Sequence, residues 1–352
     1  MALLAAIKQK DEQLVISLVD RGAKVCARVF QEVVSNKMNN LVIYILDKGY
    51  DASAENEDIS VTTAVFRRHI DTLQLLLRRG ANVESIGLYE DRTALHIAVK
   101  KDTTITRILL ENGANPNAHS VGSGTPLAIA SFYDNESAIE LLIKYKADIN
   151  CVGVPKYGSA LCAAASNCSL RASIGFLVEE TGDDINTTGG FYGSALQAAS
   201  SKGYVHLVEM LLRNGALINA KGGRCGTALQ AASYHGHVSV VYWLLENGAD
   251  VNQMGGLYGT ALQAAAFNGH ADVAELLLER GADINLEGGK YNTALDAAKQ
   301  RKLLCQRVRK FLLSRGAVDH GLEYTYNSAD DSDNYDRSSD RSNSDEDEEE
   351  SV

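Results

Sequence analysis

The fold is decided by three consecutive segments of the chain. Residues Phe191 to Gly223 read FYGSALQAASSKGYVHLVEMLLRNGALINAKGG, Arg224 to Gly256 read RCGTALQAASYHGHVSVVYWLLENGADVNQMGG, and Leu257 to Gly289 read LYGTALQAAAFNGHADVAELLLERGADINLEGG. They align without a gap at a period of 33 residues, so one structural unit is repeated. The hydroxyl residue that opens the unit recurs, with small changes of spacing, at Thr93, Thr125, Ser159, Ser194, Thr227, Thr260 and Thr293.

Each unit predicts two short helices. A Thr or Ser cap followed by Ala-Leu-Gln-Ala-Ala favours a first helix, because the hydroxyl can accept a bond from a free backbone N–H. Gly203, Gly236 and Gly269 are expected to end it in the left-handed conformation. A second helix, for example 238–246, shows an apolar stripe at helical spacing, and a glycine-rich finger leads to the next unit.

A single unit cannot bury its apolar surface alone. Paired alanines such as Ala231 and Ala232 allow neighbouring first helices to approach closely, and the Leu-Leu pairs of the second helices fill the space behind them. We therefore predict an all-α solenoid that is stabilised mainly by interfaces between adjacent units.

These residues resemble the ankyrin-repeat family, whose unit is a turn and two helices of 33 residues. The family's Thr-Pro-Leu-His opening is matched in part by Thr93-Ala94-Leu95-His96 and by Thr125-Pro126-Leu127. In later units Gln197, Gln230 and Gln263 take the place of the histidine. The Gly-Gly-x-Tyr-Gly form resembles arrays of filamentous fungi, which often follow a nucleotide-binding (NACHT-type) signalling domain.

The resemblance divides the chain into an array at 1–320, with about ten units, and an acidic tail at 321–352. The first and second units are irregular, and the sixth and tenth each carry two extra residues near the second helix. Met1 occupies the capping position of the first unit, so the first finger is missing. Either this unit is a cap, or the chain is a fragment of a longer product; its apolar start favours the second.

The net charge of −11 is not spread evenly along the 352 residues. The tail holds 12 acidic residues against Arg337 and Arg341, which leaves the array nearly neutral. We therefore expect no nucleic-acid partner. The tail composition predicts disorder. The last unit carries a net charge of +5, which suggests that the tail lies over it.

No apolar run approaches the roughly 18 residues that cross a bilayer, and the start reaches charge too soon for a signal peptide. The expectation is an intracellular protein of the cytoplasm, or of the nucleus, with no membrane partner. The six cysteines show no zinc-site spacing, and we interpret them as reduced and mostly buried.

The searches for chemistry find no catalytic constellation. The sequence lacks a phosphate-binding loop, a Gly-x-Ser-x-Gly elbow and a His-Glu-x-x-His pair. His235-Gly236-His237 is a weak candidate for a metal pair, because Gly236 is expected to end a helix between the histidines. We therefore predict no enzyme, no cofactor, no metal site and no small-molecule substrate.

What remains is a surface on which residues change from unit to unit. In ankyrin arrays the ends of the first helices and the finger tips form the concave partner-binding face. Each candidate could equally pack over a neighbouring unit. The candidates for binding a partner are Phe66, Phe132, Tyr133, Phe191, Tyr234, His235, Leu257 and Phe267.

The predicted function is a non-catalytic scaffold that binds another protein on the concave and finger surface. One alternative is a charge-based binder whose acidic tail captures a basic protein. Another is the C-terminal sensor part of a larger signalling protein.

Overall fold

The computed structural model of the chain is built from helices throughout the part that it describes. This part comprises residues 2–51, 60–87, 92–151, 158–167, 184–301 and 305–321. Within these ranges there are isolated β-bridges but no strands. The helices are α1 (Ala2–Lys8), α2 (Glu12–Asp20), α3 (Ala27–Ser35), α4 (Asn39–Asp47), α5 (Ser60–Phe66), α6 (Ile70–Arg78), α7 (Ala94–Ala98), α8 (Thr103–Glu111), α9 (Pro126–Phe132), α10 (Glu136–Lys144), α11 (Ala160–Ser166), α13 (Ala195–Lys202), α14 (Val205–Arg213), α15 (Ala228–His235), α16 (Val238–Glu246), α17 (Ala261–Asn268), α18 (Ala271–Glu279), α19 (Ala294–Lys299) and α20 (Gln306–Ser314).

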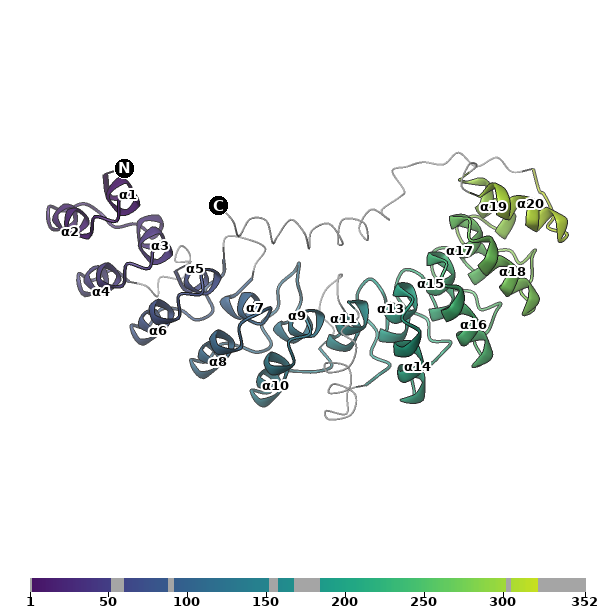
Figure 1. Cartoon of the computed structure of the whole chain (residues 1–352), viewed down its shortest axis with the longest axis horizontal. Coiled ribbons are helices and arrows are strands. Elements are labelled where there is room, and N and C mark those ends of the chain that lie inside the picture. The colour runs from purple at the N-terminus through teal and green to yellow at the C-terminus, as the bar shows by residue number, and fades with distance from the viewer. Residues whose placement is uncertain are drawn as a thin grey trace.

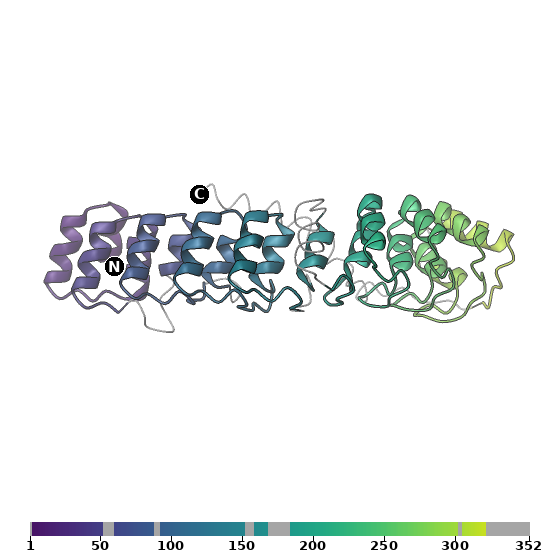
Figure 2. The same ribbon diagram turned by 90° about the horizontal axis from the view of Figure 1, so that it is seen from below.

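The helices form a curved stack of two layers (Figure 1). The first helix of each unit, such as α5, α9 or α15, lies on the inner side of the arc. The second helix, such as α6, α10 or α16, lies on the outer side. The finger loops extend together from one edge of both layers (Figure 2). The prediction of an all-α solenoid is confirmed.

The hydrophobic core combines small side chains of the first helices with larger side chains of the second helices. Ala231, Ala232, Ala264 and Ala265 are at most 1% exposed, which is why α15 and α17 can pack closely. Leucines and valines of the second helices fill the space behind them. The buried surface therefore lies between units as much as within them, as expected for a solenoid.

The helix ends adopt the expected conformations. Thr227 Oγ1 accepts from the Gln230 N–H at 3.2 Å, and the Gln230 side chain accepts in return from the Thr227 N–H at 2.8 Å. Gly236 follows α15 with a φ of +79°, and a Cβ there would lie 2.5 Å from Nδ1 of His270. Glycine is thus required for space as well as for the left-handed backbone.

Four other units place a larger residue in this left-handed position. Lys10, Lys37, Arg68 and Asp134 have φ values between +54° and +56°. A side chain costs conformational energy in this region. These earlier units therefore form the same left-handed turn without glycine, the residue that adopts this conformation at the lowest energetic cost.

Glutamines at equivalent positions of three later units form hydrogen bonds to the following unit. We call Gln197, Gln230 and Gln263 the glutamine column. Oε1 of Gln263 accepts from the N–H of Thr260 at 2.7 Å, inside its own unit. Nε2 of Gln263 donates to the carbonyls of Leu286 at 2.9 Å and Asn292 at 2.7 Å, in the following finger. His96 does the same with its two ring nitrogens, contacting the Thr93 N–H at 3.2 Å and the Gly124 carbonyl at 3.0 Å.

A second column, of finger asparagines, continues the same linkage. Oδ1 of Asn252 accepts from the N–H of Asp283 in the next unit at 2.8 Å, and its Nδ2 donates to the Gly281 carbonyl at 3.1 Å. These side-chain amides form hydrogen bonds with backbone N–H and C=O groups that would otherwise have no protein partner at the interface. The column consists of Asn117, Asn150, Asn186, Asn219, Asn252 and Asn285.

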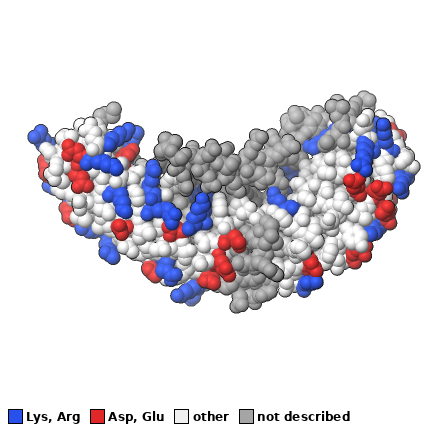
Figure 3. Space-filling view, viewed as in Figure 1, with Lys and Arg blue, Asp and Glu red and all other residues white. Residues whose placement is uncertain are grey.

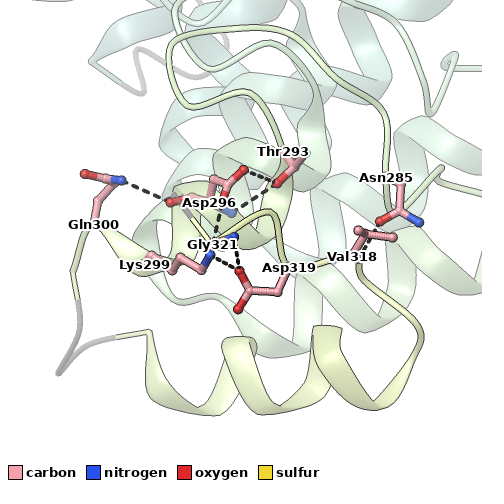
Figure 4. Close-up of polar contacts among 8 residues, drawn as sticks. All are labelled: Asn285, Thr293, Asp296, Lys299, Gln300, Val318, Asp319 and Gly321. Atoms are coloured by element: carbon pink, nitrogen blue, oxygen red, sulfur yellow. Dashed lines mark hydrogen bonds and ion pairs between the residues drawn. The ribbon is translucent and has the colours of Figure 1, made fainter. Parts of the chain in front are cut away.

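The last described unit ends the glutamine column with a carboxylate. Asp296 is fully buried, accepts from the hydroxyl of Thr293 at 2.8 Å, and pairs with Lys299 at 3.2 Å (Figure 4). Lys299 also pairs with Asp319. Although burial opposes the charged amine, the bonds to Asp319 and Asp296 raise the pKa of Lys299. An ion pair thus replaces the bridging amide at this end.

Several expectations lie outside the described residues. They include the capping role of Met1, the second helix of the sixth unit, the extra residues near 302–304, and the tail beyond Gly321.

Candidate functional site

The candidate surface is the inner side of the arc together with the finger tips. The last turn of each first helix lies in the inner layer (Figure 1), and alanines and leucines of the same helices are buried against neighbouring helices. The surface is therefore carried by helices that Gln and Asn side chains link to the following unit.

The finger tips form a continuous ladder of backbone hydrogen bonds. The N–H of Arg224 donates to the Phe191 carbonyl at 3.0 Å, and the N–H of Leu257 donates to the Arg224 carbonyl at 3.1 Å. Lys290 extends the ladder to Leu257 at 3.0 Å. The guanidinium of Arg224 lies 5.9 Å from the centre of the Phe191 ring. Phe191 and Leu257 are half-buried, so each offers only part of its surface.

Arg224 and Lys290 belong to the same column but were not among the sequence candidates. They stand 33 residues after Phe191 and Leu257 respectively, so the period itself could have identified them. A search for large apolar residues passed over them because they are charged.

Phe267 is a framework residue, and the expectation that it faces solvent is wrong. It is 2% exposed. Its ring lies 4.9 Å from that of Tyr258 and 5.1 Å from that of Tyr291, with the guanidinium of Arg301 at 4.5 Å. The finger tyrosines fold back over the end of α17 and exclude water from the phenyl ring.

Tyr234 lies at the edge of this aromatic cluster. Its ring stacks on Tyr258 at a centroid distance of 4.9 Å, and it meets the ring of His235 edge-on, also at 4.9 Å. Both Tyr234 and His235 are half-buried. The structure therefore brings Tyr234, His235 and Phe267 together, with Tyr234 and His235 accessible in part.

The remaining inner-face candidates lie toward the N-terminal half. Phe66, at the end of α5, is 60% exposed and is the most open of them. Phe132 and Tyr133 are half-buried and lie edge-on to each other at 5.3 Å, with the Lys100 amine 5.2 Å from the Tyr133 ring. Accessibility therefore differs strongly among residues that occupy equivalent columns.

The recurring histidines serve as links between units. Nε2 of His237 donates to the Ser201 carbonyl at 2.8 Å, and Nε2 of His270 donates to the Tyr234 carbonyl at 3.0 Å. Burial lowers the pKa of both rings and the carbonyl contacts only partly offset it, which favours the neutral form. Within the described ranges, no three His, Cys, Asp or Glu side chains are grouped to hold a metal ion.

The cysteines differ in exposure more than expected. Cys162 and Cys305 are buried, and burial raises the pKa of the Cys162 thiol to about 12, which makes it a poor nucleophile. Cys26 is exposed, so the expectation of burial does not hold for it. Cys168 lies outside the described residues.

Lys and Arg side chains gather over the N-terminal units on the inner side of the arc (Figure 3). In the first four units, the last turn of the first helix and the turn after it are rich in Lys and Arg. We call this surface the basic face. The corresponding turns of the next five units, where described, hold only Lys202 among Lys and Arg. The basic face consists of Lys8, Lys10, Lys37, Arg67, Arg68, Lys100 and Lys101.

None of the described helices is longer than nine residues, so none has the length or apolar character to span a bilayer.

Comparison with known proteins agrees with this architecture. A family model described as ankyrin repeats in three copies matches residues 30–120, 61–153, 161–255 and 195–288, which together cover more than half of the chain. Repeats of this family generally mediate contacts between proteins.

Three relatives show the range of proteins in which similar arrays occur. One ankyrin repeat protein of fowlpox virus is 36% identical over 127 residues, which are 34% of this chain and 37% of that relative. A second fowlpox virus ankyrin repeat protein is 30% identical over 153 residues, covering 33% of this chain and 81% of the relative. The transient receptor potential channel pyrexia of Drosophila melanogaster is 38% identical over 91 residues, covering 25% and 9%. Since the family model covers most of the helical stack, this chain belongs to the ankyrin-repeat proteins.

Proposed function

We propose that the array is a non-catalytic scaffold that binds a protein partner on its inner face and finger tips. The observation that carries this proposal is the contrast between buried apolar residues that hold adjacent units together and an apolar residue that stays exposed at an equivalent position. Phe66 is 60% exposed, whereas Phe267 in the equivalent column is sealed at 2%. The exposed ring does not serve the stack and is free to serve a partner.

The energetics favour such a surface. Burying one large aromatic side chain in an interface contributes on the order of 2 kcal/mol. Hydrogen bonds between units fix the helix that carries Phe132 before binding, because His96 bonds to the Gly124 carbonyl and Asn117 accepts from the N–H of Asp148, so little backbone entropy is lost there when a partner docks. Phe66 ends α5, and Phe132 and Tyr133 lie at the end of α9 two units further along the stack, so one extended segment could contact all three.

The test is capture of a partner by the full chain. A triple variant, Phe66→Ala with Phe132→Ala and Tyr133→Ala, is expected to lose at least about tenfold in captured partner, as measured by quantitative mass spectrometry. The matched control changes two exposed apolar residues of outer helices, Leu14→Ala and Leu313→Ala, which are 42% and 46% exposed. Equal loss in both variants would contradict the proposal, provided that both retain the wild-type melting temperature.

A binder that works through its acidic tail predicts a different result. Replacing the six consecutive acids at 345–350 by their amides would abolish capture, whereas the triple aromatic variant would retain it. The two variants therefore separate the inner face from the tail as the site that holds the partner.

A place in a larger signalling protein is a further proposal about context. It is supported by the fly channel, of which the matched region forms only 9%. The mass of the native protein detected in cells, compared with 37.9 kDa for this chain, is the measurement that checks it.

A further inference from the structure

We infer that the basic face is a docking surface for the chain's own acidic tail, residues 322–352. This inference rests on the proposed function, because its consequence is competition between the tail and a partner for the inner face.

The basic face has an excess of positive charge on a solvent-exposed surface. Its seven Lys and Arg side chains follow successive first helices, from α1 to α7. Four acids lie in the same turns: Asp102, which pairs with Arg68 at 3.0 Å; Asp71, 3.8 Å from Lys37; and Asp11 and Glu12 at the start of α2. The local balance stays positive, although the array as a whole is nearly neutral.

The tail supplies the complementary charge. It contains 12 acidic residues and two arginines, and positions 345–350 are all acidic. Because the excess charges have opposite sign and belong to one chain, their effective concentration is set by the length of the segment between them.

The length of the tail is sufficient to cross the arc. Six steps separate α19 from α7, and at a helix spacing of about 10 Å they amount to about 60 Å. The 29 residues from 322 to 350 span up to about 95 Å when extended. The curvature of the array shortens the path further, since the tail starts at the end of the stack that curves back toward the inner side (Figure 1).

The last unit is a weaker docking surface, although its net charge of +5 suggested it at first. Lys299 pairs with Asp296 and Asp319, Arg307 pairs with Asp272 at 2.8 Å, and Arg315 lies 3.8 Å from Glu275. The guanidinium of Arg301 covers Phe267 and donates to Asn268 at 2.8 Å. Much of the positive charge of the last unit is therefore paired with acidic side chains of the array or packed against its other residues.

The test is site-specific photocrosslinking in the full chain. p-Benzoylphenylalanine is introduced at position 66 on the basic face, at position 313 on α20 of the last unit, or at position 242 on the outer helix α16, all of which are exposed in the wild type. After irradiation at 0.1 M salt, the crosslinked peptides are mapped by mass spectrometry. Only the probe at 66 is expected to capture the acidic segment 345–350, within a monomer.

Charge dependence provides the second measurement. The crosslink at 66 is expected to fall at least about fivefold at 0.5 M salt, and equally when the acids at 345–350 become amides, because screening and neutralisation both remove the attraction. Hydrogen exchange in the turns after α5 and α7 should become faster in the amide variant.

Three outcomes would overturn the inference. Capture of the acidic segment 345–350 at 313 would place it on the last unit, and crosslinked dimers would assign the tail to a second copy. Absence of both the crosslink and the exchange difference would show that the tail does not dock. None of these results touches the capture of a partner by Phe66, Phe132 and Tyr133, so failure here is distinguishable from failure of the proposed function.

Discussion

At the scale of single residues, equivalent positions of the repeat have opposite roles. Phe66 and Phe267 both end a first helix, yet only Phe267 is enclosed, because finger tyrosines on either side of it fold over its ring. The unit that holds Phe66 has no Gly-x-Tyr-Gly finger of this form in the sequence. Whether an aromatic residue is framework or surface is therefore decided by its neighbours.

Truncation of the two phenylalanines separates these roles. Phe267→Ala is expected to destabilise the fold by about 3 to 5 kcal/mol, since it leaves a cavity among three rings. Phe66→Ala is expected to change stability by less than about 0.5 kcal/mol, because its ring is already hydrated. Denaturant unfolding followed by circular dichroism measures both, and similar losses would show that the burial assigned to the two rings is wrong.

A second prediction concerns the histidine in the glutamine column. Burial lowers the pKa of His96 to about 4, because the imidazolium would lose its hydration. Nδ1 of the neutral ring also accepts from the Thr93 N–H at 3.2 Å, a bond that protonation would break. A depressed pKa means that this stability is fully present above about pH 6.5 and is lost as the pH falls toward 4. At pH 5 the loss is about 2 kcal/mol.

His96→Gln tests this assignment, because glutamine occupies the same column in three later units and does not titrate. The variant is expected to match the wild type at pH 7.5 and to exceed it by about 2 kcal/mol at pH 5, as measured by urea unfolding. His237 and His270 contribute to the pH dependence of both proteins and cancel in the comparison. Identical pH profiles would rule out the buried neutral ring.

At the scale of helices and turns, the earlier units form the same left-handed turn without glycine. Lys37 has a φ of +56° and lies 3.8 Å from Asp71. Such an exposed pair contributes little to stability. The conformational cost of the lysine backbone therefore outweighs what its side chain contributes.

The prediction is that Lys37→Gly stabilises the second unit relative to Lys37→Ala by about 1 kcal/mol. Both changes remove the same ion pair, so their difference isolates the backbone. Thermal melting of the two variants is the measurement, and an alanine variant as stable as the glycine variant would mean that the turn carries no strain.

At the scale of the whole molecule, stability is the sum of local interfaces. Gln230 joins its unit to the following finger through the carbonyls of Gln253 and Gly259, the first at 2.8 Å. Removing this amide leaves buried backbone groups unpaired. In a solenoid the resulting loss of stability should be confined to the units next to the affected interface.

Gln230→Ala is expected to cost about 1 to 3 kcal/mol, with faster hydrogen exchange in α15 and α17 and unchanged exchange in α1 to α4. Hydrogen exchange with mass spectrometry resolves these regions. Asn252→Ala serves as the comparison, because it breaks an exposed link between neighbouring units at the finger edge and should cost less. Uniform acceleration along the chain would indicate that the array unfolds as one cooperative body.

The amino-acid sequence alone determined the repeat, its period, the all-α class and the Thr and Ser residues that cap the first helices from α7 onward. These features depend on contacts within one unit or between adjacent copies, and both recur every 33 residues, so the pattern records them. It also identified Phe66 as an exposed candidate.

Only the tertiary structure decided which aromatic residues are covered and where positively charged side chains gather. Phe267 is sealed by Tyr258 and Tyr291 from two fingers, and the basic face collects side chains from four units. The period shows which residues occupy equivalent positions of the repeat. The side chains that cover or pair with these residues occupy other positions, and their identity changes from unit to unit. Exposure and local charge are thus properties of the assembled surface.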